Sequence, residues 1–319
     1  ISEVDRTVIS SGLFANGAGS LSAYFSSSTA GKATASYVEM YAANPATDSS
    51  AQVQFAVGYA HIDGSGSLGN STKTTAGNRE TAALYRQFRN VLLAPNTDRF
   101  EFTSSPTASG DKDFYFISFQ RARQREKIDP GNWELKLSGN MPALFLDDKI
   151  SLIDDSGATT NPTVNQGGRV FNVVSGSITN GVHTAAASET ARGAYGLFYP
   201  DMGIILLNPT QVSNKVADIQ VVRSANAQDN NKGDLFDSIV QGANFQARRE
   251  EEISSTSYFC RVNNKRFNFS SNPTFATSSD GSLTQPTFFK DPQTFITQVG
   301  LYNDTNELLA IAKLSQPLL

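Results

Sequence analysis

The sequence predicts a β-rich α+β protein, with sandwich-like antiparallel sheets, about two helices and an extended N-terminal arm. Three observations predict this fold class. Short runs in which polar and apolar residues alternate recur through most of the chain, as in half-buried strands. Two longer segments repeat apolar residues at helical spacing. Residues 1–51 hold only isolated apolar anchors among Ser, Ala and Gly, so we expect them to lie along another surface.

The strongest strand signals lie in the middle and at the end of the chain. Residues 52–59 alternate polar and apolar side chains, and residues 114–119 form an aromatic run suited to a sheet buried on both faces. A Pro-Asp-Met-Gly turn between residues 195–199 and 204–207 predicts a β-hairpin, and residues 294–302 and 307–313 predict another. Further strands are expected at residues 133–137, 150–153, 169–178 and 253–262.

Two helices and one strong turn complete the expected elements. Residues 78–93 carry an apolar stripe, with Asn78 as a candidate N-cap and Pro95 after the end. Residues 233–248 predict a second helix with Asp234 in its first turn, although Gly242 weakens it. Residues 129–132, with the sequence Asp-Pro-Gly-Asn, predict a turn.

These elements suggest three regions. Residues 1–51 form the extended N-terminal arm, residues 52–207 a β-rich domain with one helix, and residues 208–319 a second β-rich region with one helix and a C-terminal hairpin.

The composition indicates a folded chain with uncharged polar connections. Hydrophobic residues make up 39% and charged residues 18%, against roughly 45–50% and about 25% in typical globular domains. The net charge of -4 gives no basic face, so nucleic acid is not expected as the main partner. Arg121, Arg123 and Arg125 form the best local basic run, for which an acidic partner subunit or a solvated edge is favoured over phosphate. No apolar run approaches the roughly 18 residues of a membrane span, so no membrane partner is expected.

Candidate chemical motifs are weak. A G-x-G-x-x-G match at residues 64–69 is not followed directly by a helix, so a flexible loop is favoured over a dinucleotide site. His61 and His183 have no catalytic motif beside them, and Cys260 is expected to be a buried, inert thiol. The acidic groups at residues 147–148, 154–155 and 250–252 are interpreted as solvated turns and surfaces. We therefore expect no catalytic residue, no cofactor and no metal.

Several segments resemble one family of phage proteins. They are residues 267–275, 294–304 and 307–315, together with residues 127–135, 151–157, 170–177 and 199–207. These stretches resemble virion structural proteins of large contractile-tailed, cyanophage-type myophages. The closing sequence "VGLYND…ELLAIAK" also looks like a hairpin found near the attachment ends of tail and baseplate proteins. The resemblance implies a particle component associated with tail, baseplate or neck, and it brings no catalytic residues.

The expected function is that of a structural virion subunit that builds tail, baseplate or neck through subunit interfaces, without catalysis. A host-surface or glycan-binding module of a phage particle is the alternative, for which the aromatic side chains of Trp133, Tyr199, Phe288 and Phe289 are the candidates. The expected partners are copies of the chain and other virion proteins, in a particle assembled in the host cytoplasm. The candidate interface residues are Phe14, Tyr24, Phe25, Leu301, Tyr302, Leu308, Leu309, Leu318 and Leu319.

Overall fold

The computed structural model describes residues 2–26, 36–67, 79–102, 111–139, 148–157, 162–179, 182–185, 195–221, 223, 231–277, 280–290 and 292–318. The chain forms two compact units. The large unit comprises Arg6–Ile253, and the C-terminal unit comprises Ile1–Asp5 together with Ser254–Leu319. These boundaries differ from the three regions expected from the sequence, because the N-terminal segment and residues 208–253 both pack into the large unit.

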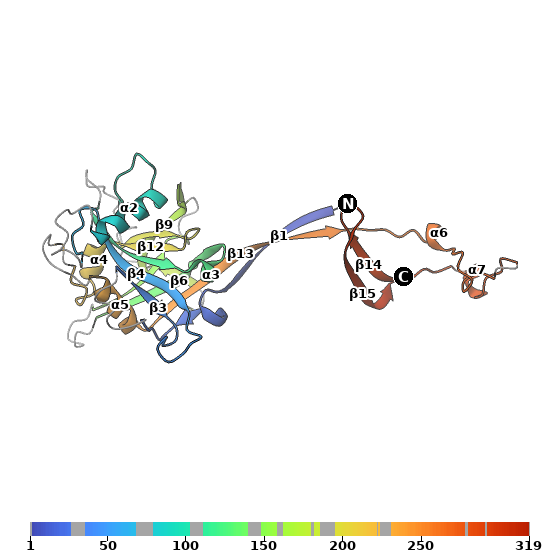
Figure 1. The fold of residues 1–319 in the computed structure, drawn as a ribbon, viewed down its shortest axis with the longest axis horizontal. Coiled ribbons are helices and arrows are strands. Elements are labelled where there is room, and N and C mark those ends of the chain that lie inside the picture. Colours follow the sequence, from blue (N-terminus) through green and yellow to red (C-terminus); the bar gives the residue numbers. More distant parts are fainter. Residues whose placement is uncertain are drawn as a thin grey trace. The chain divides into compact units, whose positions relative to one another are not determined.

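The β-rich α+β class is confirmed. Thirteen strands of the described residues join in one sheet, in the order β1-β13-β6-β7-β9-β11-β12-β5-β4-β3, with β2 paired to β13 and both β8 and β10 paired to β9 (Figure 1). The strands of this sheet are β1 (Ser2–Gly12), β2 (Ser20–Leu21), β3 (Tyr37–Tyr41), β4 (Val53–His61), β5 (Asp113–Phe119), β6 (Lys127–Ser138), β7 (Lys149–Asp154), β8 (Thr163–Asn165), β9 (Gly168–Thr179), β10 (Val182–Ala185), β11 (Gly196–Tyr199), β12 (Ile204–Leu207) and β13 (Phe245–Tyr258). The remaining two strands are β14 (Ile296–Tyr302) and β15 (Leu308–Leu318), which form a hairpin.

Two helices exceed two turns, α2 (Glu80–Leu92) and α5 (Asn231–Gly242). Among the described residues, no helix is both long and apolar enough to cross a membrane. The short helices are η1 (Ala15–Gly17), α3 (Arg121–Gln124), α4 (Pro209–Ser213), α6 (Asn264–Phe267) and α7 (Thr287–Lys290).

Strand β5 shows why the sheet of the large unit is covered on both faces. Successive side chains of a strand point to opposite faces. Tyr115 and Ile117 therefore lie in one core, and Phe114 and Phe116 lie in another. All four are buried, as the aromatic run predicts.

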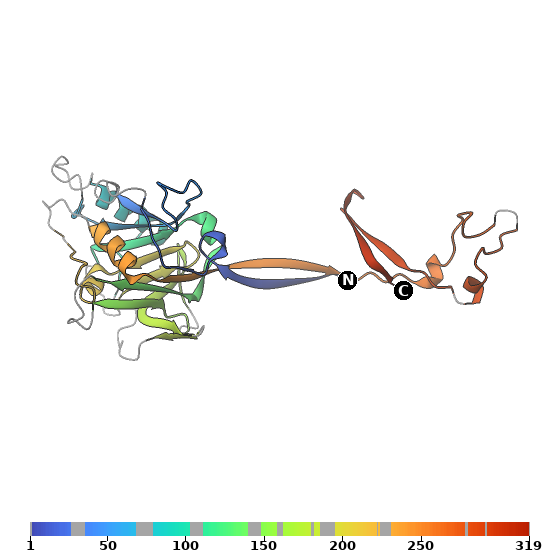
Figure 2. The same ribbon diagram turned by 90° about the horizontal axis from the view of Figure 1, so that it is seen from below.

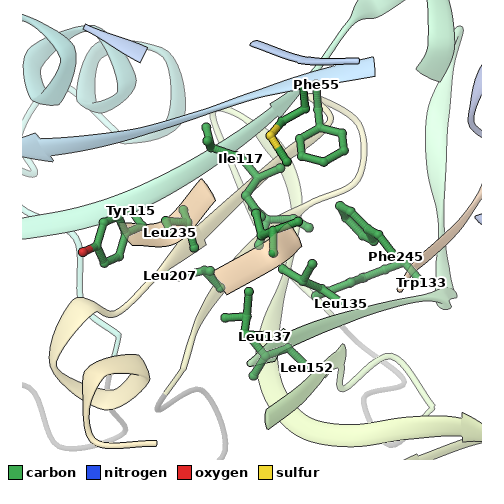
Figure 3. Packing of buried hydrophobic residues seen from close by; sticks show 14 of the residues in the cluster. Phe55, Tyr115, Ile117, Trp133, Leu135, Leu137, Leu152, Leu207, Leu235 and Phe245 are labelled. Carbon is green, nitrogen blue, oxygen red and sulfur yellow. The ribbon is translucent and has the colours of Figure 1, made fainter. Parts of the chain in front are cut away.

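The main core lies inside the curl of the sheet, around helix α5. This helix packs against β6 and against β4 and β3, which lie toward opposite ends of the strand order. Its Leu235 and Ile239 are fully buried there. The ring centroid of Phe245 in β13 lies 5.3 Å from that of Phe55 in β4 (Figure 3). It lies 5.5 Å from that of Phe119 in β5. The sandwich-like character thus comes from distant strands of one curled sheet that face each other.

The second core lies between the outer face of the sheet and helix α2. The ring of Tyr85 lies 5.1 Å from that of Phe114, and the ring of Phe88 lies 4.6 Å from that of Phe116. The apolar stripe predicted for this helix is therefore confirmed as its packing face. The candidate cap Asn78 lies outside the described residues, and the helix follows Arg79.

The described part of the G-x-G-x-x-G match supports the start of α2. The hydroxyl of Thr81 donates to the carbonyl of Ser65 at 3.0 Å and lies 2.7 Å from the hydroxyl of Ser67. Both serines are buried. Residues 64–67 therefore pack against the first helical turn, while the end of the motif lies outside the described residues.

The N-terminal segment, expected from its sequence to lie along another surface, contributes to the main core of the large unit. Strand β1 pairs with β13, as Figure 2 shows, β2 pairs with β13, and β3 pairs with β4. Apolar side chains of this segment are buried in the main core, where they pack with side chains of β4, β5, β6 and β13. The buried members are Leu13, Phe14, Leu21, Tyr24, Val38 and Met40.

The second predicted helix is shorter than expected. It ends at Gly242, and the chain enters β13 at Phe245. A Cβ on Gly242 would lie 1.9 Å from the carbonyl oxygen of Lys136, so only glycine allows this close approach to β6. Ala243 then has a φ of 50°, which breaks the helix. The helical spacing beyond Gly242 is therefore misleading.

The turn predicted at residues 129–132 is an irregularity inside β6. The pairing of β6 with β13 shifts register opposite this segment, between Ala247 and Arg249. Gly131 has a φ of 81°, and its N–H donates to a carboxylate oxygen of Asp154 at 2.8 Å. The turn-forming residues are thus accommodated as a bulge that bends the strand.

A candidate interaction surface on the C-terminal unit

The closing hairpin is formed as the sequence predicts. Strands β14 and β15 pair antiparallel, with Val299 opposite Ala312 and Leu301 opposite Ala310. The turn is organised by one side chain: the Oδ1 of Asn303 accepts from the N–H of Thr305 at 3.0 Å and from the N–H of Glu307 at 2.8 Å. Asparagine is favoured here because its short amide can bond the backbone two residues on.

The hairpin has two apolar faces. Val299, Leu301, Ala310 and Ala312 lie on one, which we call the alanine face. Because side chains alternate along a strand, the opposite face carries Gly300, Tyr302, Leu308 and Ile311, and we call it the tyrosine face. Leu309 lies at the register shift between the two strands.

The ring of Tyr302 lies over Gly300. A Cβ on Gly300 would lie 3.0 Å from the Tyr302 ring and 3.4 Å from Leu308. The aromatic side chain therefore fills the space that glycine leaves in the strand, together with Leu308.

Both faces are exposed. The large side chains of the hairpin keep about half of their surface in solvent, from 47% for Leu308 to 61% for Leu309. A single two-stranded hairpin is at best marginally stable in water, because it cannot bury an apolar face by itself. Exposed apolar patches of this kind mark interaction sites.

The rest of the C-terminal unit has a small aromatic cluster and little else that is buried. Phe275 contacts Phe269 at 5.8 Å and Phe288 at 5.3 Å between ring centroids, both edge to face. Phe289 is 83% exposed. Further exposed members of the unit are Tyr258, Phe259, Val262, Phe267 and Phe295.

The candidate interface residues divide into two groups. The exposed group consists of Leu301, Tyr302, Leu308, Leu309 and Leu318, while Leu319 lies outside the described residues. Phe14 and Tyr24 belong to the other group, because they are buried in the chain's own core. Phe25 is half-buried and bridges to Tyr41.

The candidate list omits Val299, Ile311 and the exposed phenylalanines of the C-terminal unit. A sequence signal for the first two exists. Apolar residues stand at both odd and even positions of the two strands, as in the neighbours Leu301 and Tyr302. Since successive side chains point to opposite faces, this pattern predicts a strand pair with two apolar faces.

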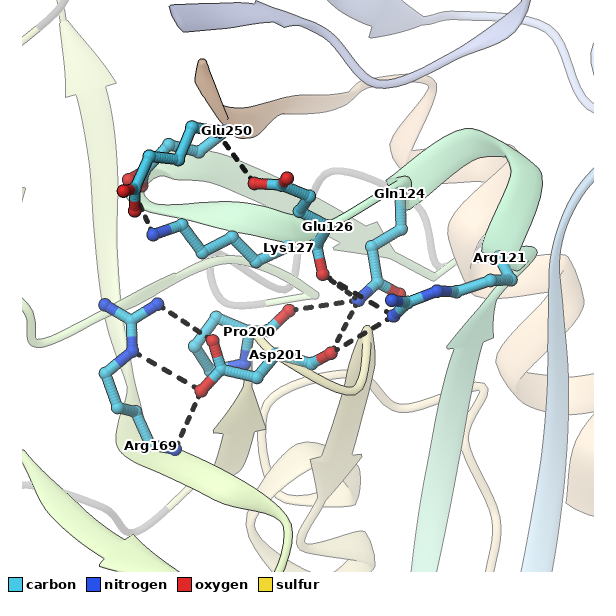
Figure 4. A network of polar contacts seen from close by, with 9 residues as sticks. Arg121, Gln124, Glu126, Lys127, Arg169, Pro200, Asp201 and Glu250 are labelled. Atoms are coloured by element: carbon cyan, nitrogen blue, oxygen red, sulfur yellow. Dashed lines mark hydrogen bonds and ion pairs between the residues drawn. The ribbon is translucent and has the colours of Figure 1, made fainter. Parts of the chain in front are cut away.

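Two of the basic residues after β5 form ion pairs within the large unit. Lys127 pairs with Glu250 at 2.8 Å, as Figure 4 shows, and Arg125 pairs with Glu251 at 2.9 Å. The acidic partners of these two residues therefore lie on β13 of the same chain, whereas the sequence suggested a partner subunit. Arg121 instead donates to the backbone carbonyls of Glu126 and Asp201, at 3.5 and 3.4 Å.

A buried amide holds the turn between β11 and β12. The Nε2 of Gln124 donates to the carbonyl of Asp201 at 2.8 Å and to that of Pro200 at 3.3 Å (Figure 4). Arg169 donates to the Asp201 carboxylate through its backbone N–H and through Nη2, each at 2.9 Å. Burial acts to raise the pKa of Asp201, but the bonds and charge of Arg169 outweigh it and lower that pKa below its ordinary value. The network is structural, since every named group is satisfied within it.

The acidic pair at residues 154–155 is also structural. Asp154 and Asp155 are buried, not solvated as expected. Asp154 accepts from the N–H groups of Gly131 and Ser156, at 2.8 and 2.9 Å. Asp155 accepts from the backbone and side-chain N–H groups of Asn172, at 2.9 and 2.8 Å. These carboxylates join neighbouring strands, and their bonds explain their burial.

The aromatic candidates for a glycan groove are mostly inside the protein. Trp133 and Tyr199 are buried, and Trp133 packs on Phe198 with centroids 5.3 Å apart. Burial raises the pKa of Tyr199 to about 12, so its phenol stays neutral. Phe288 is half-buried, which leaves Phe289 as the exposed candidate.

Cys260 is exposed, which corrects the expectation of a buried thiol. Strand β13 ends at Tyr258, so this residue follows the strand. Within the described ranges, no three His, Cys, Asp or Glu side chains gather as a metal site.

His61 is a buried histidine at the end of β4. Its Nδ1 accepts a hydrogen bond from the N–H of Asp63 at 3.1 Å, so the ring is neutral. Burial lowers its pKa, and the charges of Lys112 and Arg223 act in the same direction, against the opposing effect of Asp113 and Asp63. His183 lies in β10.

Acidification is therefore expected to destabilise the large unit through His61. Its folded-state pKa lies below the unfolded value of about 6.5, so its contribution to stability is present above about pH 6.5 and is lost as the pH falls toward the folded value. Urea unfolding of wild type and His61→Asn at pH 8, 6.5 and 5 measures this, because the Asn amide keeps an acceptor for Asp63 without titrating. The variant should lose less stability than wild type on acidification; identical pH profiles would contradict the assignment.

Comparisons of the chain with protein-family models, with curated proteins and with solved structures found no match. The fold and the exposed apolar surface of the C-terminal unit are therefore the basis for a functional proposal.

Proposed function

We propose that this chain is a structural subunit of a contractile-tailed phage particle, which builds tail, baseplate or neck through subunit interfaces without catalysis. The observation that carries the proposal is the distribution of exposed apolar side chains. Of the 22 exposed large hydrophobic residues in the described part of the chain, 15 belong to the C-terminal unit, which holds fewer than a quarter of all residues. A unit with so much uncovered apolar surface is suited to being covered by neighbouring subunits.

The large unit supports the proposal in a different way. Its charged residues at the β6–β13 edge pair with one another, and its buried carboxylates bond backbone N–H groups of adjacent strands. Such groups hold a rigid body together and leave few reactive side chains at these positions. A rigid β-rich body with an apolar contact unit is suited to a building element of a large assembly.

The test is the distribution of the chain in a lysate of infected host cells. After density-gradient separation, quantitative mass spectrometry of each fraction should find the chain with complete particles, at a constant ratio to the shell and tube proteins. A chain that remains in the soluble fractions while particles form normally would contradict a structural role.

The alternative is a host-surface or glycan-binding module of a particle. Phe289 is the specific observation in its favour, because an aromatic ring with 83% exposure can stack on a sugar. Replacement of Phe289 by alanine should abolish adsorption to host cells if the alternative holds, and should leave adsorption unchanged if the chain is purely structural.

A further inference from the structure

The closing hairpin exposes a large apolar surface. Its seven large exposed side chains, about half exposed, present on the order of 500 Å² of apolar area, judged from the area of large side chains. A stable protein interface buries about 800 Å² on each partner, of which about 65% is apolar in homodimers. The two faces together therefore approach the apolar contribution of one such interface, and a contact that uses one face of each hairpin supplies about half of it.

The charge of the hairpin suits association between identical copies. Lys313 is the one charged residue within its two strands, and Asp304 and Glu307 lie in the turn. A second copy would therefore bring almost no like charge against this surface. A strongly charged partner would find little to pair with, so the chemistry of the surface favours another copy of the chain.

The two faces differ in relief. The alanine face is low, because Ala310 and Ala312 lie opposite Leu301 and Val299. The tyrosine face projects, because the ring of Tyr302 stands over Gly300. A projecting face packs best into a low one, as in other close-packed protein interfaces.

A two-fold symmetric pair would leave one of these faces in water. If two tyrosine faces met, both Lys313 side chains would lie on the contacting faces, because Lys313 pairs with Gln298 on that face. If two alanine faces met, both tyrosine faces would stay exposed. Contact of an alanine face with the tyrosine face of the next copy covers both and sets Lys313 against an uncharged surface.

Resting on the structural role proposed above, we propose that the hairpins of neighbouring copies pack alanine face to tyrosine face in a closed ring. Such a head-to-tail contact uses two different surfaces of each copy, and closure around an axis then requires at least three copies. The second copy of this chain is thus the partner of the exposed hairpin.

The experiment uses the full chain and one substitution on each face. Val299→Asp places a charge on the alanine face, and Ile311→Asp places one on the tyrosine face. Val164→Asp is the matched control, because Val164 is 72% exposed in β8 of the large unit. Sedimentation velocity gives the number of copies, and thermal unfolding of the large unit checks that each variant is folded.

The proposal predicts a distinctive result for mixtures. Wild type and Val164→Asp should form a species of three or more copies, and each hairpin variant alone should be monomeric, with association weakened on the order of 100-fold or more. An equal mixture of Val299→Asp and Ile311→Asp should form a one-to-one pair, because each variant retains the face that the other has lost. Two-fold symmetric contacts cannot give this complementation.

Other outcomes would overturn the proposal. A wild-type dimer, a wild-type monomer, or a mixture of the two variants that stays monomeric would each contradict head-to-tail packing. The gradient experiment separates this failure from failure of the structural role. A monomeric chain found at constant ratio in particles refutes the ring and retains the role, with another virion protein on the hairpin. A ring that is absent from particles refutes the role and retains the ring.

Discussion

Replacement of Phe245 by alanine is expected to lower the free energy of unfolding of the large unit by about 3–5 kcal/mol, the usual cost of removing a fully buried phenylalanine. Phe245 is fully buried at the start of β13. Its ring lies 5.7 Å from Phe14, 5.3 Å from Phe55 and 5.5 Å from Phe119, between centroids. It therefore joins the N-terminal segment to two strands from the opposite end of the sheet. Urea unfolding followed by far-ultraviolet circular dichroism measures the loss.

The matched control is Phe289→Ala, in which the same atoms are removed from a side chain that is 83% exposed. Its effect should stay within about 0.5 kcal/mol. Equal losses for the two variants would show that the contacts of Phe245 do not hold the curled sheet together.

Deletion of residues 1–51 is expected to prevent folding of the large unit. The deletion removes β3 and several fully buried side chains, among them Leu13, Phe14 and Met40. Each large buried side chain contributes about 2–5 kcal/mol, and whole domains are stable by only about 5–15 kcal/mol. Circular dichroism and limited proteolysis of the truncated chain should therefore show an unfolded or insoluble product.

A shorter deletion provides the control. Removal of Ile1–Asp5, which belong to the C-terminal unit, leaves every core residue of the large unit in place. This variant should unfold at nearly the wild-type urea concentration. A soluble, cooperatively folded product of the longer deletion would show that the N-terminal segment is an accessory arm, as its sequence alone suggests.

One smaller change distinguishes backbone from side-chain effects in the hairpin. Gly300→Val should displace the Tyr302 ring and leave the strand pairing intact, because an added Cβ would meet that exposed ring and Leu308, and no backbone atom is among its close neighbours. Hydrogen exchange of amides 296–302 should stay at the wild-type rate. Faster exchange across the whole strand would show that the hairpin itself requires glycine.

The elements that could be predicted from sequence are those with a local cause. The aromatic run of β5, the stripe of α2 and the two hairpins each have a periodicity and a turn of their own. The end of α5 could not be predicted in this way. The helix ends where Ala243 adopts a φ of 50°, next to Gly242, whose contact with the carbonyl of Lys136 comes from a strand more than a hundred residues earlier in the chain.

The candidate interface residues divide in the same way, into those whose exposure has a local cause and those whose burial depends on distant strands. The exposure of Leu301, Tyr302 and Leu308 was predictable, because a two-stranded hairpin with apolar residues on both faces cannot bury them within itself. Phe14 and Tyr24, by contrast, are apolar residues in a stretch rich in Ser, Ala and Gly, which carries no such pattern. Their burial depends on β4, β5 and β13, whose positions no local pattern encodes.

Strand β13 has a mechanical consequence. Ser254–Leu319 are covalently joined to the large unit at one point, between Ile253 and Ser254 within β13, so tension on them passes into the large unit along this strand. In the large unit β13 pairs with β6 from Phe245 to Glu250. A pull along the strand loads these hydrogen bonds together in shear, because ladder bonds run perpendicular to the strand. The strand is thereby built to carry load without unzipping one bond at a time.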